Sequence, residues 1–247
     1  MIGGQGEIQL GVIMAKLKDR FGVEVKVVPQ KIAYRETIRG TSDVQGKHKK
    51  QSGGAGQYGD VHIKFSPSTE EFEFTESLFG GSIPKNYVPA VEKGLIESMN
   101  KGPLAGCKVV NIKAELYDGS YHDVDSSEMA FKIAASIAFK KGVMEANPCL
   151  LEPIMKLEIT VPENYMGDVM GDMNKRRGKI LGMEPQEDGS QKIIAEAPQA
   201  ELFDYSMVLR SMTQARGNFE MEFARYENMP QSIAERIISQ YQNGESK

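Results

Sequence analysis

The stretch KHKKQSGGAGQYGDVHIKF, residues 47–65, decides between two folds for the first half of the chain. Its glycines have the spacing Gly54-x-Gly56-x-x-Gly59, which is typical of a dinucleotide-binding loop. Such a loop leaves a buried strand and opens a helix, so that the phosphates meet the helix N-terminus. Here the glycines follow basic and polar residues, and residues 60–65 alternate between polar and apolar side chains, as in a half-exposed strand. The pattern predicts a β-hairpin, whose exposed basic tip is either a mobile loop or a loop suited to insertion into RNA.

Composition is that of a globular protein long enough for two domains. The chain has 247 residues, a formal net charge of −4 and no apolar run that could span a membrane. Cys107 and Cys149 form no metal-ligand pattern, so we expect reduced thiols in a cytoplasmic protein. Cations cluster at residues 47–50 and 175–179, and each cluster is either a solvated face or a phosphate contact.

Hydrophobic periodicity predicts the first two parts of the chain. Residues 1–28 should form half of a small α/β sandwich, with a strand end at 7–10, a helix at 9–21 and a strand at 23–28. The second part should contain the following strands and helices: strands near 32–38, 44–51, 60–66, 72–78 and 107–117, a helix at 87–100 and a helix after residue 125. In that last helix, Asp125 and Glu128 suit a capping box, and Met129, Ile133 and Ile137 should form the buried stripe.

Asn147-Pro148 marks the next boundary. The segments predicted after it, in chain order, are a strand (154–161), a helix (162–177), two strands (178–185 and 190–197), a helix (198–213) and a strand (217–225). This βαββαβ order is the ferredoxin-like arrangement, and an amphipathic helix at about 229–242 follows it.

The chemistry-bearing residues give no strong sign of an enzyme. His48, His62 and His122 lack metal-ligand spacing, and no GxxxxGK[ST] motif for a nucleotide occurs. His122 lies among acidic residues, which permits general acid–base chemistry, although capping and hydrogen bonding explain the loop equally well. The stretches NKRRGKI, from residue 174, and RSMTQARGNF, from residue 210, each place cations at a helix end, which suits either the helix dipole or an RNA phosphate.

Several long motifs occur together in one order: AYRETI, GGAGQYG, GGSIPKNYVPAVEKG, LYDGSYHDVDSSEMAFKIA, LEPIMKLEITVPENYMGDVMGDMNKRRGKILGMEP and LRSMTQARGNFEMEF. They closely resemble the C-terminal part of bacterial elongation factor G, the translocation GTPase of the ribosome. The resemblance covers essentially the whole chain and implies an α+β protein in three parts. Residues 1–28 would be the second half of the family's domain III, 29–149 a ribosomal protein S5 domain 2-like domain IV, and 150–247 a ferredoxin-like domain V with the C-terminal helix.

The resemblance also implies a function and the residues that serve it. In the family, two loops at the tip of domain IV enter the decoding region and help to move tRNA and mRNA. The matching tip residues are Ser52, Gly53, Gly54, Ala55, Gly56, Gln57, Tyr58, Asp118, Gly119, Ser120, Tyr121 and His122. Domain V faces large-subunit rRNA, and its matching or nearby residues are Arg210, Ser211, Gln214, Arg216, Lys175, Arg176 and Arg177.

The expected partners are therefore the ribosome, rRNA, tRNA and mRNA, and neither DNA nor a membrane. The chain is expected to be monomeric. No catalytic residue, metal or cofactor is expected in the chain itself, since GTP and Mg²⁺ belong to a GTPase domain of the parent protein. Two departures matter: Ala55 stands where the family often has Arg, and Asp60 where it often has His. They leave open a paralogue for ribosome recycling or a ribosome-binding module that does not move tRNA.

Overall fold

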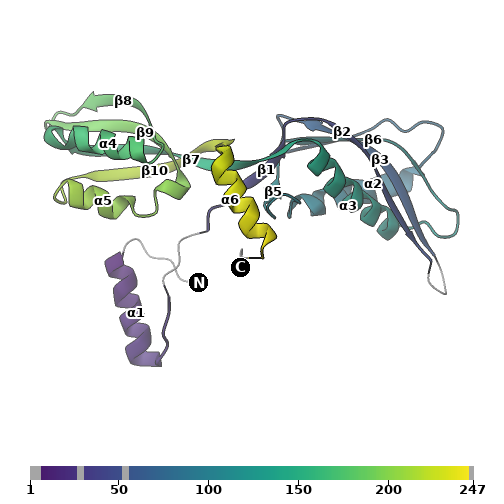
Figure 1. The fold of residues 1–247 in the computed structure, drawn as a ribbon, viewed down its shortest axis with the longest axis horizontal. Helices are drawn as coiled ribbons and strands as arrows, with labels where there is room; N and C mark the ends of the chain where they lie inside the picture. Colours follow the sequence, from purple (N-terminus) through teal and green to yellow (C-terminus); the bar gives the residue numbers. More distant parts are fainter. Residues whose placement is uncertain (1–6, 27–30, 52–55, 245–247) are drawn as a thin grey trace. The chain divides into compact units, whose positions relative to one another are not determined.

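The computed structural model describes residues 7–26, 31–51 and 56–244 (Figure 1). The chain divides into two compact units. The first, which we call the tip unit, contains Ala33–Glu152 and Tyr226–Lys247. The second contains Met1–Ile32 and Pro153–Arg225, and we call residues 153–225 of it the ferredoxin-like unit. The mixed α+β class predicted from the sequence is confirmed.

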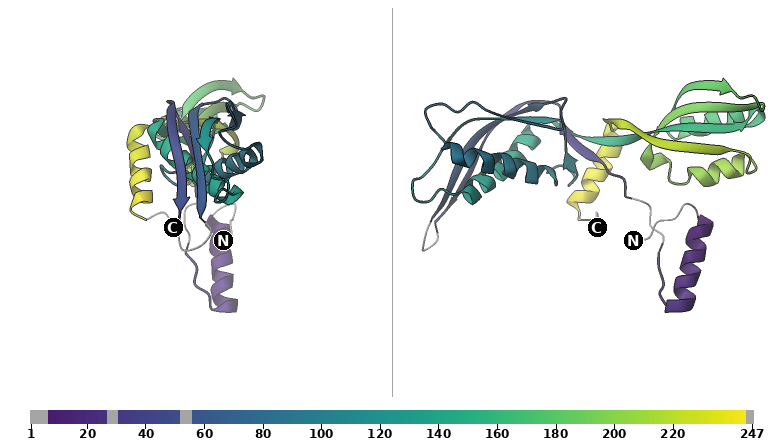
Figure 2. Two further views of the ribbon diagram at one scale, coloured as in Figure 1. Left: turned by 90° about the vertical axis from the view of Figure 1, so that its right-hand side faces the viewer. Right: turned by 180° about the vertical axis from the view of Figure 1, so that it is seen from behind.

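The tip unit is built on a four-stranded sheet in the order β2-β3-β6-β4. Its strands are β2 (Ser42–Lys50), β3 (Gln57–Pro67), β6 (Ile112–Ser120) and β4 (Phe72–Glu76). β2 pairs antiparallel with β3 in continuous register from Ser42↔Phe65 to Lys50↔Gln57, so the predicted hairpin is present. Helices α2 (Val88–Met99) and α3 (Glu128–Glu145) lie against this sheet, and the hairpin extends beyond them (Figure 1 and the right-hand view of Figure 2).

Glycines in the hairpin allow α3 to approach the sheet closely. A Cβ added at Gly59 would lie 2.6 Å from the Ala130 carbonyl oxygen, and one added at Gly46 would meet the Ala134 carbonyl oxygen. A Cβ added at Gly56 would lie 2.6 Å from the Asp125 carboxyl carbon. The spacing Gly56-x-x-Gly59 thus serves close packing within the tip unit, because the glycine-rich turn joins two strands rather than a strand and a helix.

Two expectations for α3 are wrong. Its N-cap is Ser127, whose hydroxyl accepts the Ala130 N–H at 3.2 Å, rather than Asp125. The buried face consists of small and aromatic residues: Ala130, Phe131, Ala134, Ala135, Ala138, Phe139, Gly142 and Val143. Of the predicted stripe, Met129 is 59% exposed and Ile137 40%, and Ile133 is only half-buried. Small side chains occupy the buried face because they let the helix lie directly on the hairpin.

A smaller set of strands and the last helix complete the tip unit. β1 (Arg35–Ile38) lies between β5 (Lys108–Val109) and the start of β7 (Pro148–Pro162). Buried Glu36 accepts the backbone N–H groups of Leu104, Ala105 and Cys107 at 2.9–3.0 Å. This loop forms an apolar cluster with α6 (Gln231–Gln242). The predicted helix at 229–242 is therefore present, and it belongs to the tip unit rather than to the ferredoxin-like one.

The ferredoxin-like unit has the predicted βαββαβ order. The remaining elements in it are α4 (Met166–Lys175), β8 (Lys179–Pro185), β9 (Ser190–Pro198), α5 (Tyr205–Met212) and β10 (Asn218–Asn228), with 3-10 turns at Glu163–Tyr165 and Gln199–Glu201. β7 pairs with both β9 and β10, and β8 pairs with β9, which gives the order β10-β7-β9-β8. Both helices contribute to one core on β7, formed around Leu157, Ile159 and Val161.

The first residues differ from the expected half-sandwich. α1 (Glu7–Phe21) includes the segment 7–10 that was expected to end a strand. Residues 22–26, the described part of the expected strand at 23–28, are exposed and form no strand. In the tip unit, a 3-10 turn at Lys85–Tyr87 directly precedes α2.

Candidate nucleic-acid interface

The base of the hairpin and the loop after β6 are joined by hydrogen bonds. The Tyr58 N–H donates to the Asp125 carbonyl at 2.8 Å, and the Gly56 N–H donates to Asp125 Oδ1 at 3.1 Å. The Ser126 hydroxyl donates to the Tyr58 carbonyl at 2.9 Å and accepts the His122 N–H, also at 2.9 Å. Two segments more than 60 residues apart in sequence therefore form a single end of the tip unit.

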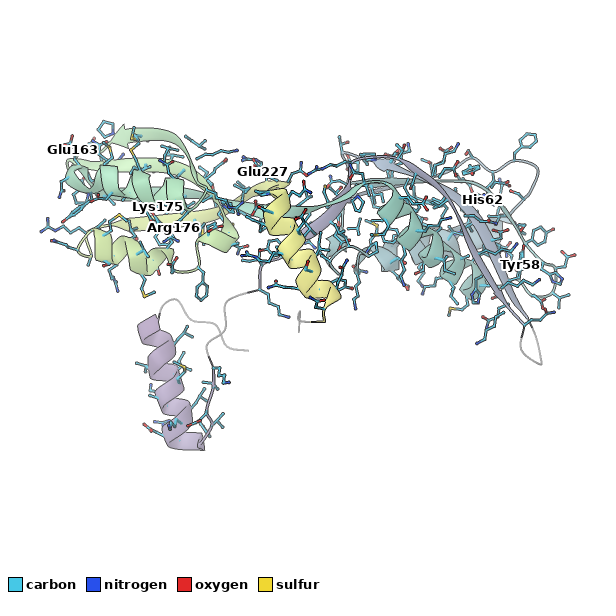
Figure 3. All side chains as sticks on the ribbon, viewed as in Figure 1. Tyr58, His62, Glu163, Lys175, Arg176 and Glu227 are labelled. Carbon is cyan, nitrogen blue, oxygen red and sulfur yellow. The ribbon has the colours of Figure 1, made fainter. Side chains whose placement is uncertain are left out.

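A second chain of hydrogen bonds runs across the sheet below this end. The Tyr58 hydroxyl lies 2.7 Å from Ser120 Oγ, which donates to Asp60 Oδ2 at 2.8 Å. Gln45 Nε2 donates to Asp60 Oδ1, also at 2.8 Å. Asp60 and Ser120 are direct partners in the pairing of β3 with β6, which explains their proximity. These hydrogen bonds hold the half-buried Tyr58 ring near the end of the hairpin, where Figure 3 labels it.

Asp60, one of the two departures from the family pattern, is 5% exposed. Lys47 Nζ lies 3.7 Å from Asp60 Oδ2 and 5.4 Å from the centre of the Tyr58 ring. The Tyr58 hydroxyl, and after it the charge of Asp60, raise the pKa of Lys47 above its ordinary value. The carboxylate is thus buried among partners and balanced by a cation, so it presents no bare negative charge to an approaching phosphate.

His122 lies in the loop after β6 with a defined hydrogen-bonding pattern. Its Nδ1 accepts the backbone N–H groups of Val124 and Asp125 at 3.3 and 3.2 Å. In the neutral ring this assigns the proton to Nε2. Asp125 Oδ2 is 3.6 Å from Nδ1. The ring lies 6.4 Å from that of Tyr58, at an interplanar angle of 53°. The arrangement presents an exposed ring whose Nε2 has no hydrogen-bond partner among the described residues, which suits stacking and hydrogen bonding to bases.

The structure brings together most of the described tip residues. Gln57 is exposed and its Oε1 lies 2.8 Å from His48 Nε2. Asp118, Gly119 and Ser120 are the last residues of β6, and Tyr121 is 45% exposed just beyond it. The predicted residues Ser52, Gly53, Gly54 and Ala55 lie outside the described residues.

Sequence reasoning missed four residues that build this end: Gln45, Lys47 and Asp60 in the hairpin, and Ser126 in the loop. Lys47 was noted only as part of a basic run, and Asp60 only as a departure. The position of Ser126, four residues after His122, is the one local signal, since a serine at that spacing can bond back to a loop N–H.

The second group of predicted residues lies around α5 and the turn after it. Arg210, Ser211, Gln214 and Arg216 are all exposed. Gln214 and Ala215 both have positive φ angles, 52° and 64°, which are costly for residues with a Cβ. Buried Thr213 holds this turn: its hydroxyl donates to the Leu209 carbonyl at 2.7 Å and accepts the Gly217 N–H at 2.8 Å. The turn is thereby kept in a shape that directs polar side chains to the surface.

The cations at the end of α4 differ in their partners. Arg176 donates to Asp172 Oδ2 at 2.7 Å and to Asp204 Oδ1 at 2.6 Å, and its side chain is only 11% exposed. Arg177 has a φ of 58° and lies 3.1 Å from Glu201 Oε1. Lys175 is exposed and has no acidic partner among the residues that the structure describes (Figure 3). Both arginines therefore tie the end of α4 to the segment before α5, whereas the exposed side chain of Lys175 takes no part in this link.

Two further findings concern metals and membranes. Within residues 7–26, 31–51 and 56–244, no group of three His, Cys, Asp or Glu side chains is placed to hold a metal ion. None of the helices described there is long and apolar enough to cross a bilayer.

The structure thus contains an S5 domain 2-like unit with a two-loop tip and a ferredoxin-like unit. These are the two units that the sequence resemblance predicts for the C-terminal part of a translation elongation factor. Two family models match the chain: elongation factor G, domain IV, over residues 29–147, and elongation factor G C-terminus, over residues 149–237. The chain belongs to the elongation factor G family, of which it contains these two regions. A protein from Thermus thermophilus with a known crystal structure has a sequence 45% identical to this chain. The two structures match with a TM-score of 0.89, over 97% of this chain and 36% of that one. The chain thus spans little more than a third of that protein's length.

Proposed function

We propose that this chain is the ribosome-contacting part of an elongation-factor-G-type translocation factor, and that its tip enters the decoding region of the small subunit. The observation that carries the proposal is the joining of the hairpin to the 121–127 loop through Tyr58, Asp125 and Ser126. This joint presents the rings of Tyr58, Tyr121 and His122 at one end of the unit, where bases of tRNA or mRNA could stack on them.

The ferredoxin-like unit would contact rRNA of the large subunit through the turn after α5. Arg210 and Arg216 supply charge there, while Ser211 and Gln214 supply hydrogen-bonding groups. Lys175 adds a cation at the end of α4, whereas Arg176 and Arg177 act on the shape of the unit through their acidic partners.

The chain would perform this role without a catalytic residue or cofactor of its own. GTP and Mg²⁺ would act in another part of the parent protein, and the chain would work in the cytoplasm as a monomer. Ribosome affinity of the chain alone should be weak and strongly salt-dependent, because phosphate contacts dominate the interaction.

The test is single-turnover translocation with the chain joined to the rest of its parent protein. His122→Ala should slow translocation more than it weakens ribosome binding, whereas Lys175→Ala should weaken binding and lower its salt dependence. Asp60→His and Ala55→Arg address the two departures. If the parent moves tRNA only after Ala55→Arg, the protein is a specialised paralogue. If it binds ribosomes and never moves tRNA, the translocation proposal fails.

A further inference from the structure

The tip unit has a second feature, away from the hairpin, that the proposed function does not use. A hollow of about 250 Å³ is lined by Arg35, Glu71, Lys108, Val110, Asn111 and Tyr226. Arg35 belongs to the AYRETI motif, on strand β1, and Lys108 lies on β5. The two cations are direct partners in the parallel pairing of these strands. Like charges at paired positions repel, and Glu71, which forms an ion pair with Lys108, offsets one of these two charges.

The Arg35 guanidinium lies over an aromatic ring. Its guanidinium carbon lies 5.6 Å from the centre of the Tyr226 ring. The Tyr226 hydroxyl donates to the Ala33 carbonyl at 2.9 Å, which holds the ring in place. Among the residues that the structure describes, no carboxylate forms an ion pair with the Arg35 guanidinium. A guanidinium that lies over a ring can still direct the N–H donors at its edges toward a planar or tetrahedral oxyanion.

Glu71, the one carboxylate among the residues lining the hollow, already has a cationic partner. Glu71 forms an ion pair with Lys108, and Lys108 lowers the pKa of this carboxyl, with a smaller contribution from Arg35. Two cations and one carboxylate leave the lining with an excess positive charge. The backbone N–H groups of Val110 and Asn111 are also occupied, by the carbonyls of Glu36 and Glu71 at 2.9 Å each. A ligand would therefore be held by side chains, chiefly by Arg35 and Lys108.

We infer that this hollow binds a phosphate group, with Arg35 as its main donor and Lys108 and the side-chain amide of Asn111 beside it. One N–H of that side-chain amide donates to the Thr69 carbonyl at 3.4 Å, which leaves the second N–H for the ligand. A tetrahedral dianion fits the unbalanced charge and the geometry of an arginine edge better than a neutral ligand does. The source of the phosphate would be the backbone of ribosomal RNA, and this part of the inference rests on the proposed function. The hollow would then be a phosphate contact of the tip unit that is separate from the two-loop tip.

The first experiment needs no ribosome. The full ¹⁵N-labelled chain is titrated with inorganic phosphate and, in parallel, with chloride at equal ionic strength. The Arg35 side-chain N–H and the Asn111 amide should shift saturably with phosphate only. Arg35→Gln should abolish the response, and Arg39→Gln, an equal charge change outside the hollow, should keep it. Lys108→Gln, which should weaken the response, serves as a second variant if Arg35→Gln unfolds.

The second experiment identifies the source of the phosphate. Ribosome affinity is measured against salt concentration, and Arg35→Gln should lower the slope of log K on log salt by about one, whereas Arg39→Gln should not. Shifts that are equal in chloride, or that survive Arg35→Gln, would overturn the phosphate site. Shifts that behave as expected together with an unchanged slope would overturn the RNA source. Absence of any ribosome binding would refute the proposed function while leaving the first experiment valid.

Discussion

Replacing Gly59 with alanine tests whether this glycine serves packing rather than phosphate binding. The new Cβ would lie 2.6 Å from the Ala130 carbonyl oxygen, 2.7 Å from the Ala130 carbonyl carbon and 2.9 Å from the Phe131 backbone nitrogen. All three are backbone atoms of α3, so no side-chain rotation can relieve the contact. Overpacking of a core commonly costs about 1–3 kcal/mol, and for backbone contacts we expect the upper end, about 3 kcal/mol.

The assay is thermal and urea unfolding of the full chain, followed by signals from the tip unit. At about 3 °C per kcal/mol for a unit of this size, the tip-unit transition should fall by about 10 °C. Gly182→Ala, followed by signals from the ferredoxin-like unit in which Gly182 lies, is the control, because a Cβ there meets no atom within 4 Å. It should stay within about 0.5 kcal/mol of the parent. A Gly59→Ala chain as stable as the parent would refute the packing explanation and restore a ligand-binding role for the loop.

Three further predictions concern other contacts. Arg176→Ala should destabilise the ferredoxin-like unit by about 2 kcal/mol in urea unfolding, because Asp172 and Asp204 both lose their partner. Lys175→Ala, as the control, should change the stability by less than about 0.5 kcal/mol. Equal effects of the two substitutions would contradict this prediction. The hydrogen bond from Arg176 lowers the pKa of Asp204, so its stabilisation is present above the ordinary Asp pKa and lost as pH falls through the folded value. Asp204→Asn should therefore flatten the acid limb of a stability–pH curve, and an unchanged limb would count against it. Ser126→Ala removes the bridge between the Tyr58 carbonyl and the His122 N–H and should cost about 1 kcal/mol, with faster hydrogen exchange at His122; unaltered exchange would show that the bridge is dispensable.

The hairpin and the order of elements could be predicted because they depend on local patterns. Alternation in residues 60–65 marks β3, and the βαββαβ order follows from periods of two and 3.6 residues. The orientation of α3 could not be predicted in the same way. Met129, Ile133 and Ile137 have helical spacing and high hydropathy, but the sheet accepts the alanine face, and that choice depends on Gly46 and Gly59 across the interface.

The motif resemblance predicts where the tip loops lie in the sequence, and it predicts none of the contacts between them. In the structure, the rings of Tyr58 and His122, one from each predicted loop, lie 6.4 Å apart. The resemblance could not show that Asp60 is buried, because that depends on the pairing of β3 with β6 and on Gln45 across the hairpin. Nor could it separate Lys175 from Arg176, since adjacent residues of a helix end point in different directions and only one of them meets Asp172 and Asp204.

The measurement that tests the central claim most directly is a photo-crosslink from the tip. A benzophenone amino acid replaces Tyr121 in the chain joined to the rest of its parent, and the crosslinked ribosomal components are identified after irradiation. The same group at Phe203, which is 63% exposed in the ferredoxin-like unit, is the control. We expect crosslinks from position 121 to tRNA, mRNA or decoding-region rRNA, and different targets from position 203. Crosslinks from position 121 to protein alone, or the same targets from both positions, would contradict it.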